Sequence, residues 1–156
     1  MYCTINKTES IRNFLCRRGP DQFAKLQIPV HSAGDYQTGL QLCLMSSGLQ
    51  LRGGKQLCDQ PLMDIAGNVL QWNGQVFAGD LTIDDTESDT EVLMKALAKC
   101  ETDAQLLAVF SQIAGPWSFT YWDSRRRLYW FGRDVLGRRS LCWNTDPAPP
   151  VGGNTG

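Results

Sequence analysis

Histidine is almost absent from this chain, since His31 is the only one among 156 residues. A Ser-His-Asp or Cys-His catalytic arrangement would have to use it. His31 lies in "PVHSAGDY", which reads as a loop and has no nucleophile signature around it. The six cysteines contain no Cys-x-x-Cys pair, so the closely spaced ligands of a zinc site are lacking as well. We therefore expect neither histidine-based hydrolysis nor a metal site.

Long hydrophobic runs and a strong net charge are also missing. No apolar run approaches the roughly 20 residues that span a bilayer. The opening residues, "MYCTINKTES", lack the apolar core of a secretory signal. The net charge of −1 gives no general attraction to nucleic acid or to a membrane surface. These absences predict a cytoplasmic protein in a reducing compartment, with neither nucleic acid nor membrane among its partners.

One basic run interrupts this even balance of charge. Residues 125–127, "RRR", lie between two aromatic-rich segments, and arginine beside aromatic rings is an arrangement that can stack on RNA bases. Because the run also lies between two expected strands, we favour a solvated hairpin tip. RNA binding is the alternative interpretation.

Apolar residues make up 42% of the chain, which is enough for the core of one domain. We assign residues 1–144 to that domain. Residues 145–156 are rich in proline and glycine and have little to bury, which predicts a disordered tail.

Three segments have helical patterns. Residues 9–18 carry one apolar face, formed by Ile11, Phe14 and Leu15. Two further helices are predicted by capping boxes, in which a Ser or Thr is followed three residues later by Glu or Gln. These boxes are Ser88 with Glu91 and Thr102 with Gln105.

Alternating or aromatic-rich segments predict the strands. They are residues 39–47, 49–52, 68–72, 75–77, 117–122, 128–131 and 138–143. Because strands and helices do not alternate as βαβ units, the pattern predicts an α+β fold with largely antiparallel sheets and helices packed against them.

Asn73-Gly74 is the short motif with two competing interpretations. It separates two of the expected strands, and Asn-Gly is the strongest short-range signal of a tight β-hairpin turn. The same dipeptide can also present a side-chain amide and a backbone N–H to a negatively charged oxygen. The hairpin is the simpler of the two.

The scarcity of histidine does not exclude hydrolysis. A nucleophile at the first position of a mature chain can use its own α-amino group as the base, because that group titrates at about pH 8. This design directs attention to the N-terminus and to Cys3.

Several stretches resemble, in order, the class II glutamine amidotransferase domain of asparagine synthetases. They are "CRRGPDQF", "LQLRGG" followed by "QPL", "VLQWNGQVF", "ESDTEVLMKAL", "GPWSFTYWD" and "LYWFGRDVLGRRSL". The resemblance covers residues 11–143. It implies an N-terminal-nucleophile hydrolase, an αββα sandwich of two antiparallel sheets in which a cysteine attacks the side-chain amide of glutamine. The ammonia released would serve asparagine formation in a separate synthetase domain that uses ATP and Mg, with no cofactor in this domain.

The resemblance also assigns roles to individual residues. Arg52 matches the arginine that pairs with the α-carboxylate of glutamine, and Asp89 matches the acid that receives its α-ammonium group. Asn73 and Gly74 match the oxyanion hole, with Gln75 next to the bound substrate. Arg52 could instead be an ordinary strand-end arginine, and Asp89 an acidic residue in the first turn of a helix.

The N-terminus departs from the family pattern. The family begins Met-Cys-Gly, whereas this chain begins Met1-Tyr2-Cys3. Methionine is removed efficiently only before a small residue, so Cys3 would keep an amide in place of a free amine. The nucleophile is then either Cys3 after processing or a cysteine upstream of this sequence. The short spacing before Gly19 predicts that the usual first strand is missing or replaced, and the sequence stops before the last strands of the family pattern. We therefore expect a sandwich that is truncated at both ends, as a fragment would be.

Gln75 also departs from the family pattern. It stands where the family usually has glutamate, which removes a charge beside the substrate.

The sequence as a whole leaves three interpretations of the protein's function. They are a glutaminase that supplies ammonia, an inactive domain that binds glutamine or a protein partner, and a structural remnant that folds poorly.

Overall fold

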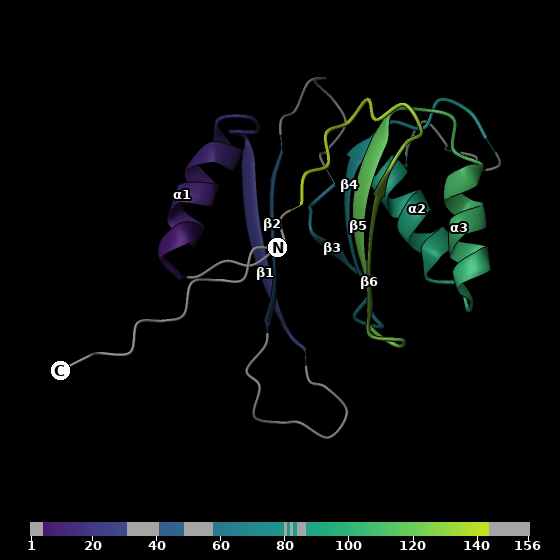
Figure 1. Ribbon diagram of the computed structural model, residues 1–156, viewed down its shortest axis with the longest axis horizontal. Helices are drawn as coiled ribbons and strands as arrows, with labels where there is room; N and C mark the ends of the chain where they lie inside the picture. The colour runs from purple at the N-terminus through teal and green to yellow at the C-terminus, as the bar shows by residue number, and fades with distance from the viewer. Residues whose placement is uncertain are drawn as a thin grey trace.

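The protein was analysed as a computed structural model that describes residues 5–30, 41–48, 58–79, 81, 83 and 87–143, with the backbone alone for residues 5–10. The elements in chain order are α1 (Ile5–Cys16), β1 (Gln22–Pro29), β2 (Gln41–Gly48), β3 (Leu62–Met63), β4 (Val69–Gly74), α2 (Asp89–Leu97), α3 (Asp103–Ser111), β5 (Trp117–Asp123) and β6 (Leu128–Arg133). They form four layers, with α1 on one outside, α2 and α3 on the other, and two sheets between them (Figure 1).

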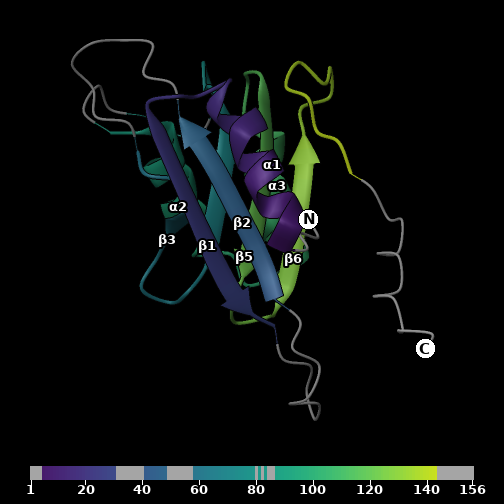
Figure 2. The ribbon, with the colours of Figure 1, turned by 90° about the vertical axis from the view of Figure 1, so that its left-hand side faces the viewer.

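Both sheets are antiparallel. One consists of β1 and β2, and the other has the strand order β3-β4-β5-β6. Turned by 90°, the molecule presents α1 in front of β1 and β2, with the larger sheet behind them (Figure 2). The predicted α+β class with antiparallel sheets is confirmed, whereas the N-terminal-nucleophile type stays a prediction.

The middle of the larger sheet is buried on both faces because it has a layer on each side. Val69 and Trp122 face the smaller sheet and form a core with Leu44. Their chain neighbours Leu70 and Tyr121 point the other way, into the larger core under α2 and α3. This alternation is the two-residue period of a strand, applied to a strand with two apolar faces.

Gln71 connects the two sheets by hydrogen bonds. Its Nε2 donates to the Met45 carbonyl oxygen at 2.8 Å and to the Ser46 Oγ at 2.7 Å. Its Oε1 accepts from the Thr120 hydroxyl on β5 at 2.9 Å. A polar side chain between two sheets is tolerated here because both ends of its amide have partners.

The helices α2 and α3 begin where the capping boxes predict. The Ser88 hydroxyl accepts from the Thr90 N–H, and the Glu91 carboxylate accepts from the Ser88 N–H. The reciprocal bonds join Thr102 and Gln105 at the start of α3. Such local signals act within four residues, which is why the sequence alone locates them.

The hairpin turn predicted at Asn73-Gly74 is wrong. Both residues belong to β4, where Asn73 pairs with Ser118 and Gly74 pairs with Trp117. Pairing with a strand more than 40 residues further on in the sequence overrides the local turn preference of Asn-Gly. The hairpin in this region lies earlier, between β3 and β4, where Gly67 has a φ of 82°.

Other boundaries also differ from the sequence prediction. Residues 75–77 and 138–143 are not strands, and β1 was not predicted at all. Strand β2 confirms the segment predicted at 39–47 within its described part, and β5 and β6 confirm 117–122 and 128–131. Helix α1 begins before residue 9 and ends at Cys16, and Phe14 is 63% exposed where an apolar face was expected. His31, residues 49–52 and residues 145–156 lie outside the described residues.

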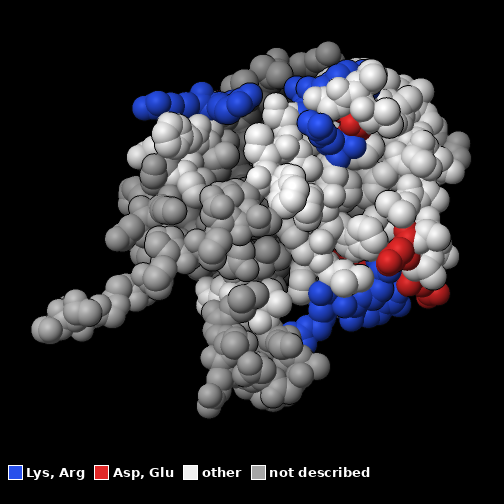
Figure 3. All heavy atoms as spheres, viewed as in Figure 1, with Lys and Arg blue, Asp and Glu red and all other residues white. Residues whose placement is uncertain are grey.

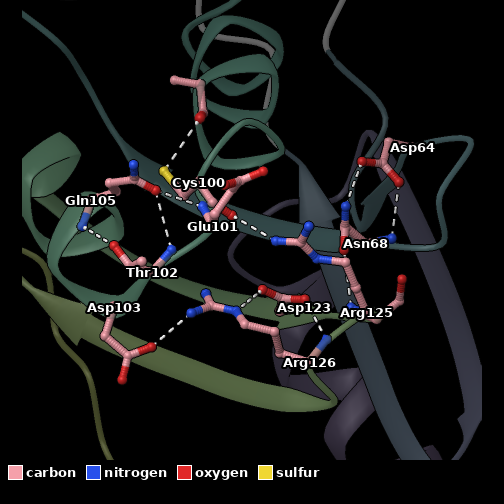
Figure 4. A network of polar contacts seen from close by, with 12 residues as sticks. Asp64, Asn68, Cys100, Glu101, Thr102, Asp103, Gln105, Asp123, Arg125 and Arg126 are labelled. Atoms are coloured by element: carbon pink, nitrogen blue, oxygen red, sulfur yellow. Dashed lines mark hydrogen bonds and ion pairs between the residues drawn. The ribbon is translucent and has the colours of Figure 1, made fainter.

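The "RRR" run forms the tip between β5 and β6, as predicted. Arg126 bonds to Asp123 at 2.6 Å and to Asp103 at 2.7 Å, and Arg125 donates to the Cys100 carbonyl oxygen at 3.5 Å (Figure 4). On the face shown in Figure 3, basic side chains lie along the upper edge and in a group at the lower edge, with acidic side chains beside the upper-right and the lower ones. Two of the three arginines are therefore engaged in holding the tip against the start of α3.

Candidate functional site

Four of the six candidate residues are described, and they lie close together. Asn73 and Gly74 end β4, Gln75 follows, and Asp89 is the first residue of α2. The Asp89 Oδ2 accepts a hydrogen bond from the Val76 N–H at 2.8 Å, which brings the start of α2 against the segment after β4. The other two candidates, Cys3 and Arg52, lie outside the described residues.

The Gly74 N–H points away from β5. Trp117, its partner across the ladder, directs its C=O to the Asp134 N–H at 2.9 Å and its own N–H to the Asp134 carboxylate at 3.1 Å, both on the far side. In an antiparallel ladder such a pair is of the type without mutual hydrogen bonds. Gly74 therefore directs its N–H to the opposite edge of β4.

On that edge of β4, the backbone N–H groups two residues before and two residues after Gly74 are both hydrogen-bonded. Two residues before it, the Trp72 N–H donates to the Gln60 Oε1 at 2.6 Å. Two residues after it, the Val76 N–H donates to Asp89. Among the described residues no acceptor for the Gly74 N–H is found between them. The Gly74 N–H is therefore available as a donor, whereas the N–H groups of Trp72 and Val76 are already hydrogen-bonded.

The Asn73 side chain is on the face of the sheet that is turned to β1 and β2. It shares this face with Val69 and Gln71 by the period of the strand. Asn73 is exposed, while Ser118 opposite it is only 6% exposed. An amide at the open end of the space between two sheets is accessible to a small polar molecule.

Gly74 is a site where the strands come close together. A Cβ at this position would lie 2.7 Å from the Pro116 carbonyl oxygen and 2.7 Å from the Trp117 Cβ. Both contacts are shorter than real Cβ atoms make, so any larger residue would displace β5. Glycine is therefore required here by packing, independently of any catalytic role.

Asp89 uses only one carboxylate oxygen within the described part of the chain. Its Oδ2 accepts from Val76, and its Oδ1 has no hydrogen-bond partner there. The residue lies in the first turn of α2, where the helix dipole stabilises a negative charge. One oxygen thus holds the segment after β4, and the other is available to a cationic group such as an ammonium.

Cys58 and Cys100 do not offer an activated nucleophile. Burial raises the pKa of Cys58 and the pKa of Cys100, which favours the neutral thiol in both. Cys58 interacts with Ser88 at the start of α2, and the lowering effect of this hydrogen bond on its pKa is smaller than the raising effect of burial. Among the described residues there is also no group of three His, Cys, Asp or Glu residues that could hold a metal ion.

Asp134 supports the strand opposite Gly74. Its carboxylate accepts from the N–H groups of Trp117, Leu136 and Arg138, and from the Arg138 guanidinium at 3.4 Å. Burial alone would raise the pKa of Asp134, but these hydrogen bonds outweigh it and hold the pKa below its usual value.

A lowered pKa in the folded state predicts sensitivity to acid. The stabilisation from Asp134 is complete above the pKa of the unfolded chain, for which 3.8 is the reference value, and is lost as the pH falls through the lower folded value. We expect the melting temperature to fall between pH 5 and pH 3 (roughly the titration range of an aspartate), and to fall less in Asp134→Asn. Equal acid sensitivity of the two proteins would contradict this role.

One hollow of the described surface lies away from the candidate residues. It has a volume of about 540 Å³ and lies between α3 and the turn after β6, with Phe77, Leu107 and Leu136 among its lining residues. None of Asn73, Gly74, Gln75 or Asp89 lines it. No helix among the described residues is long and apolar enough to cross a membrane.

Comparison with known proteins assigns the family. The model of the "Glutamine amidotransferase domain" family matches residues 55–151, which include Asn73, Gly74, Gln75 and Asp89. The chain belongs to this family. The match confirms the family resemblance that the sequence motifs indicate.

The chain is also similar to several curated proteins. The chain is 43% identical over 130 residues to "Asparagine synthetase domain-containing protein 1" of Gallus gallus and 40% identical over 131 residues to that of Homo sapiens. Each match covers 83% of this chain and 19% of the relative. A protein of Drosophila melanogaster, "Asparagine synthetase domain-containing protein CG17486", is 26% identical over 140 residues, covering 88% of this chain and 23% of the relative. The chain thus spans about a fifth of the length of these relatives, and no solved structure matches it.

Sequence reasoning missed two residues of the amidotransferase domain that the structure places beside the candidate site. Gln60 bonds to the backbone of Trp72, directly before Asn73. The "QPL" stretch signalled a resemblance only, because nothing in the local pattern shows that a side chain will bond to a strand twelve residues further on. Val76 was missed for the same reason, since it acts through its backbone N–H.

Proposed function

We propose that this domain hydrolyses the side-chain amide of glutamine to glutamate and ammonia. The observation that carries the proposal is the Gly74 N–H, which has no acceptor among the described residues and lies between two anchored donors, with the Asn73 amide beside it and Asp89 nearby. Membership of the amidotransferase family gives this geometry its chemical meaning.

In the proposed reaction a cysteine thiolate attacks the amide carbon of glutamine. The carbonyl electrons move to oxygen, and the Gly74 N–H and the Asn73 amide stabilise the resulting oxyanion. The α-amine of the cysteine takes the thiol proton and transfers it to the leaving nitrogen, so that ammonia departs and a thioester remains. Water then attacks the thioester, which releases glutamate and restores the thiol.

Two of the remaining candidates are proposed to bind the α-ammonium and α-carboxylate groups of glutamine. The Asp89 Oδ1 is the proposed acceptor for the α-ammonium group, and Arg52 is the proposed partner of the α-carboxylate. Gln75 lies beside the oxyanion donors and is the proposed neighbour of the bound amide. Cys3, or a cysteine upstream of this sequence, is the proposed nucleophile.

The ammonia is proposed to serve asparagine formation. The names of the curated relatives contain "asparagine synthetase", and this chain spans only about a fifth of their length. The proposed partner is therefore a separate synthetase domain that uses ATP and Mg, and the proposed fold of the present domain is an αββα sandwich of the N-terminal-nucleophile type. The described cysteines are free thiols, which supports the proposed location in the reducing cytoplasm.

An electrophilic glutamine analogue, diazo-oxo-norleucine, tests the proposal directly. The purified chain is incubated with the analogue, with and without excess glutamine, and any adduct is located by intact mass and peptide mapping. We expect one adduct, on an N-terminal cysteine, which glutamine suppresses. An unmodified protein, or an adduct that glutamine does not suppress, would contradict the proposed hydrolysis.

A second candidate function is glutamine binding without hydrolysis. The observation that favours it is the peptide bond between Tyr2 and Cys3 in the sequence, because an acylated nitrogen has no basicity and cannot take the thiol proton. A titration with glutamine distinguishes the two functions. If the domain binds glutamine without turnover, glutamine stays intact but still protects the protein against thermal unfolding.

A further inference from the structure

Strand β3 does not extend along the part of β4 that carries the proposed oxyanion donors. It pairs only at Leu62 with Leu70 and at Met63 with Val69. Continuing this register would place residue 61 opposite Gln71 and residue 60 opposite Trp72. Residue 61 is a proline joined to Gln60 by a cis peptide bond, and the backbone ladder between the two strands does not continue past Leu62.

The side chain of Gln60 takes over where the backbone ladder stops. Its Oε1 accepts from the Trp72 N–H at 2.6 Å, and its Nε2 donates to the Trp72 carbonyl oxygen at 2.9 Å. A primary amide has the same donor and acceptor as a peptide group. Gln60 therefore supplies both bonds that a neighbouring strand would make at Trp72.

Gln60 also connects this edge to the start of α2. Its Nε2 lies 3.4 Å from the hydroxyl oxygen of Thr90, which is only 4% exposed. Thr90 follows Asp89, whose carboxylate holds the Val76 N–H. The segment from Trp72 to Val76 is thus fixed at both ends to one short piece of the molecule, with the Gly74 N–H in between.

We propose that Gln60 is a positioning residue for the oxyanion donors, which deepens the proposed function and rests on it. Asn73 and Gly74 directly follow the residue that Gln60 holds, and they have no other strand on that edge within the described residues. Oxyanion donors act by being fixed in advance, so that no reorganisation is needed in the transition state. Losing the Gln60 amide lets the backbone at Trp72 rotate, and the Gly74 N–H rotates with it.

The first test follows amide hydrogen exchange in the full chain and needs no turnover. In Gln60→Leu we expect the Trp72 amide to exchange roughly 10-fold faster than in the wild type, because a hydrogen bond in a partly buried site is lost. The matched control is Asn68→Ala, which removes a buried amide at the other end of β4 that bonds to Asp64 and to the Ser124 N–H. Exchange at Trp72 that is equally fast in both variants would overturn the proposal, because general destabilisation would then explain it.

The second test separates positioning from substrate binding in glutamine turnover. In Gln60→Leu we expect kcat to fall about 10-fold or more while KM stays within about twofold, because the misplaced donors act on the transition state. Asn68→Ala is expected to keep the wild-type kcat. A Gln60→Leu enzyme with wild-type kcat would overturn the inference. A wild-type chain without turnover would contradict the proposed function alone, since the exchange test still decides whether Gln60 holds the segment.

Discussion

Gly115→Ala is expected to lower the free energy of unfolding more than any other single methyl addition near the candidate site. A Cβ on Gly115 would lie 1.9 Å from the Gln75 carbonyl oxygen and 3.1 Å from its carbon. The obstacle is backbone, so no side chain can rotate out of the way. Overpacking of this kind costs about 3 kcal/mol, which corresponds to a fall in melting temperature of roughly 6–12 °C for a domain of this size.

The control for this variant is Ala114→Ser at the neighbouring position. It also adds one heavy atom, but Ala114 is exposed, so its melting temperature is expected to stay near that of the wild type. Thermal melts followed by circular dichroism compare the two. A Gly115→Ala protein as stable as the control would mean that the Gln75 segment lies further from Gly115 than the geometry indicates.

Asn73→Ala is expected to have the largest effect on catalysis with the smallest effect on folding. In a preparation that turns over glutamine, kcat should fall about 100- to 1,000-fold, which is the usual cost of removing one oxyanion donor. Because the Asn73 side chain is exposed, the melting temperature should hardly change. Steady-state kinetics and a thermal melt on the same preparation measure both quantities.

Asn13→Ala provides the matched control, since Asn13 is also exposed but lies on α1, far from β4 in the sequence. It makes the same chemical change and should leave kcat and KM unchanged. If Asn73→Ala kept kcat within a few-fold of the wild type, the side-chain amide would not belong to the oxyanion hole. The Gly74 N–H would then be the remaining candidate.

The parts of the fold that the sequence predicts well are those decided by neighbouring residues. The capping boxes at Ser88 and Thr102 involve only the next three residues, and both helices begin there. The aromatic strands β5 and β6 are joined by a short turn, so their pairing is also local. Such elements depend little on the rest of the chain.

The parts that the sequence does not predict depend on distant partners. Asn73-Gly74 has the composition of a turn, but both residues pair with the strand that begins at Trp117 and so form the end of a strand. Residues 138–143 have the aromatic and apolar content of a strand, but the preceding chain is turned around the Asp134 carboxylate. In both cases the competing partner lies outside the window that a local pattern covers.

For the candidate site, the residue identities came from motifs and the direction of each group came from the structure. The motifs indicate Asn73, Gly74, Gln75 and Asp89, which do lie together. That the Gly74 N–H faces an open edge follows only from the register with Trp117 and Asp134. Gln60 could not be found in advance because its role depends on where β3 stops.

The two cores of this molecule are unequal, and this bears on how it comes apart. Among the described residues, the core under α2 and α3 contains twelve buried residues, whereas the core between the two sheets contains three. Cooperative units with little buried apolar area open at lower free energy than the whole molecule. We therefore expect the layer of α1, β1 and β2 to open as a separate unit, before the unit that contains β4 and the proposed oxyanion donors. A partly opened molecule would then lose the layer that faces the Asn73 side chain, while Asn73 and Gly74 keep their places on β4.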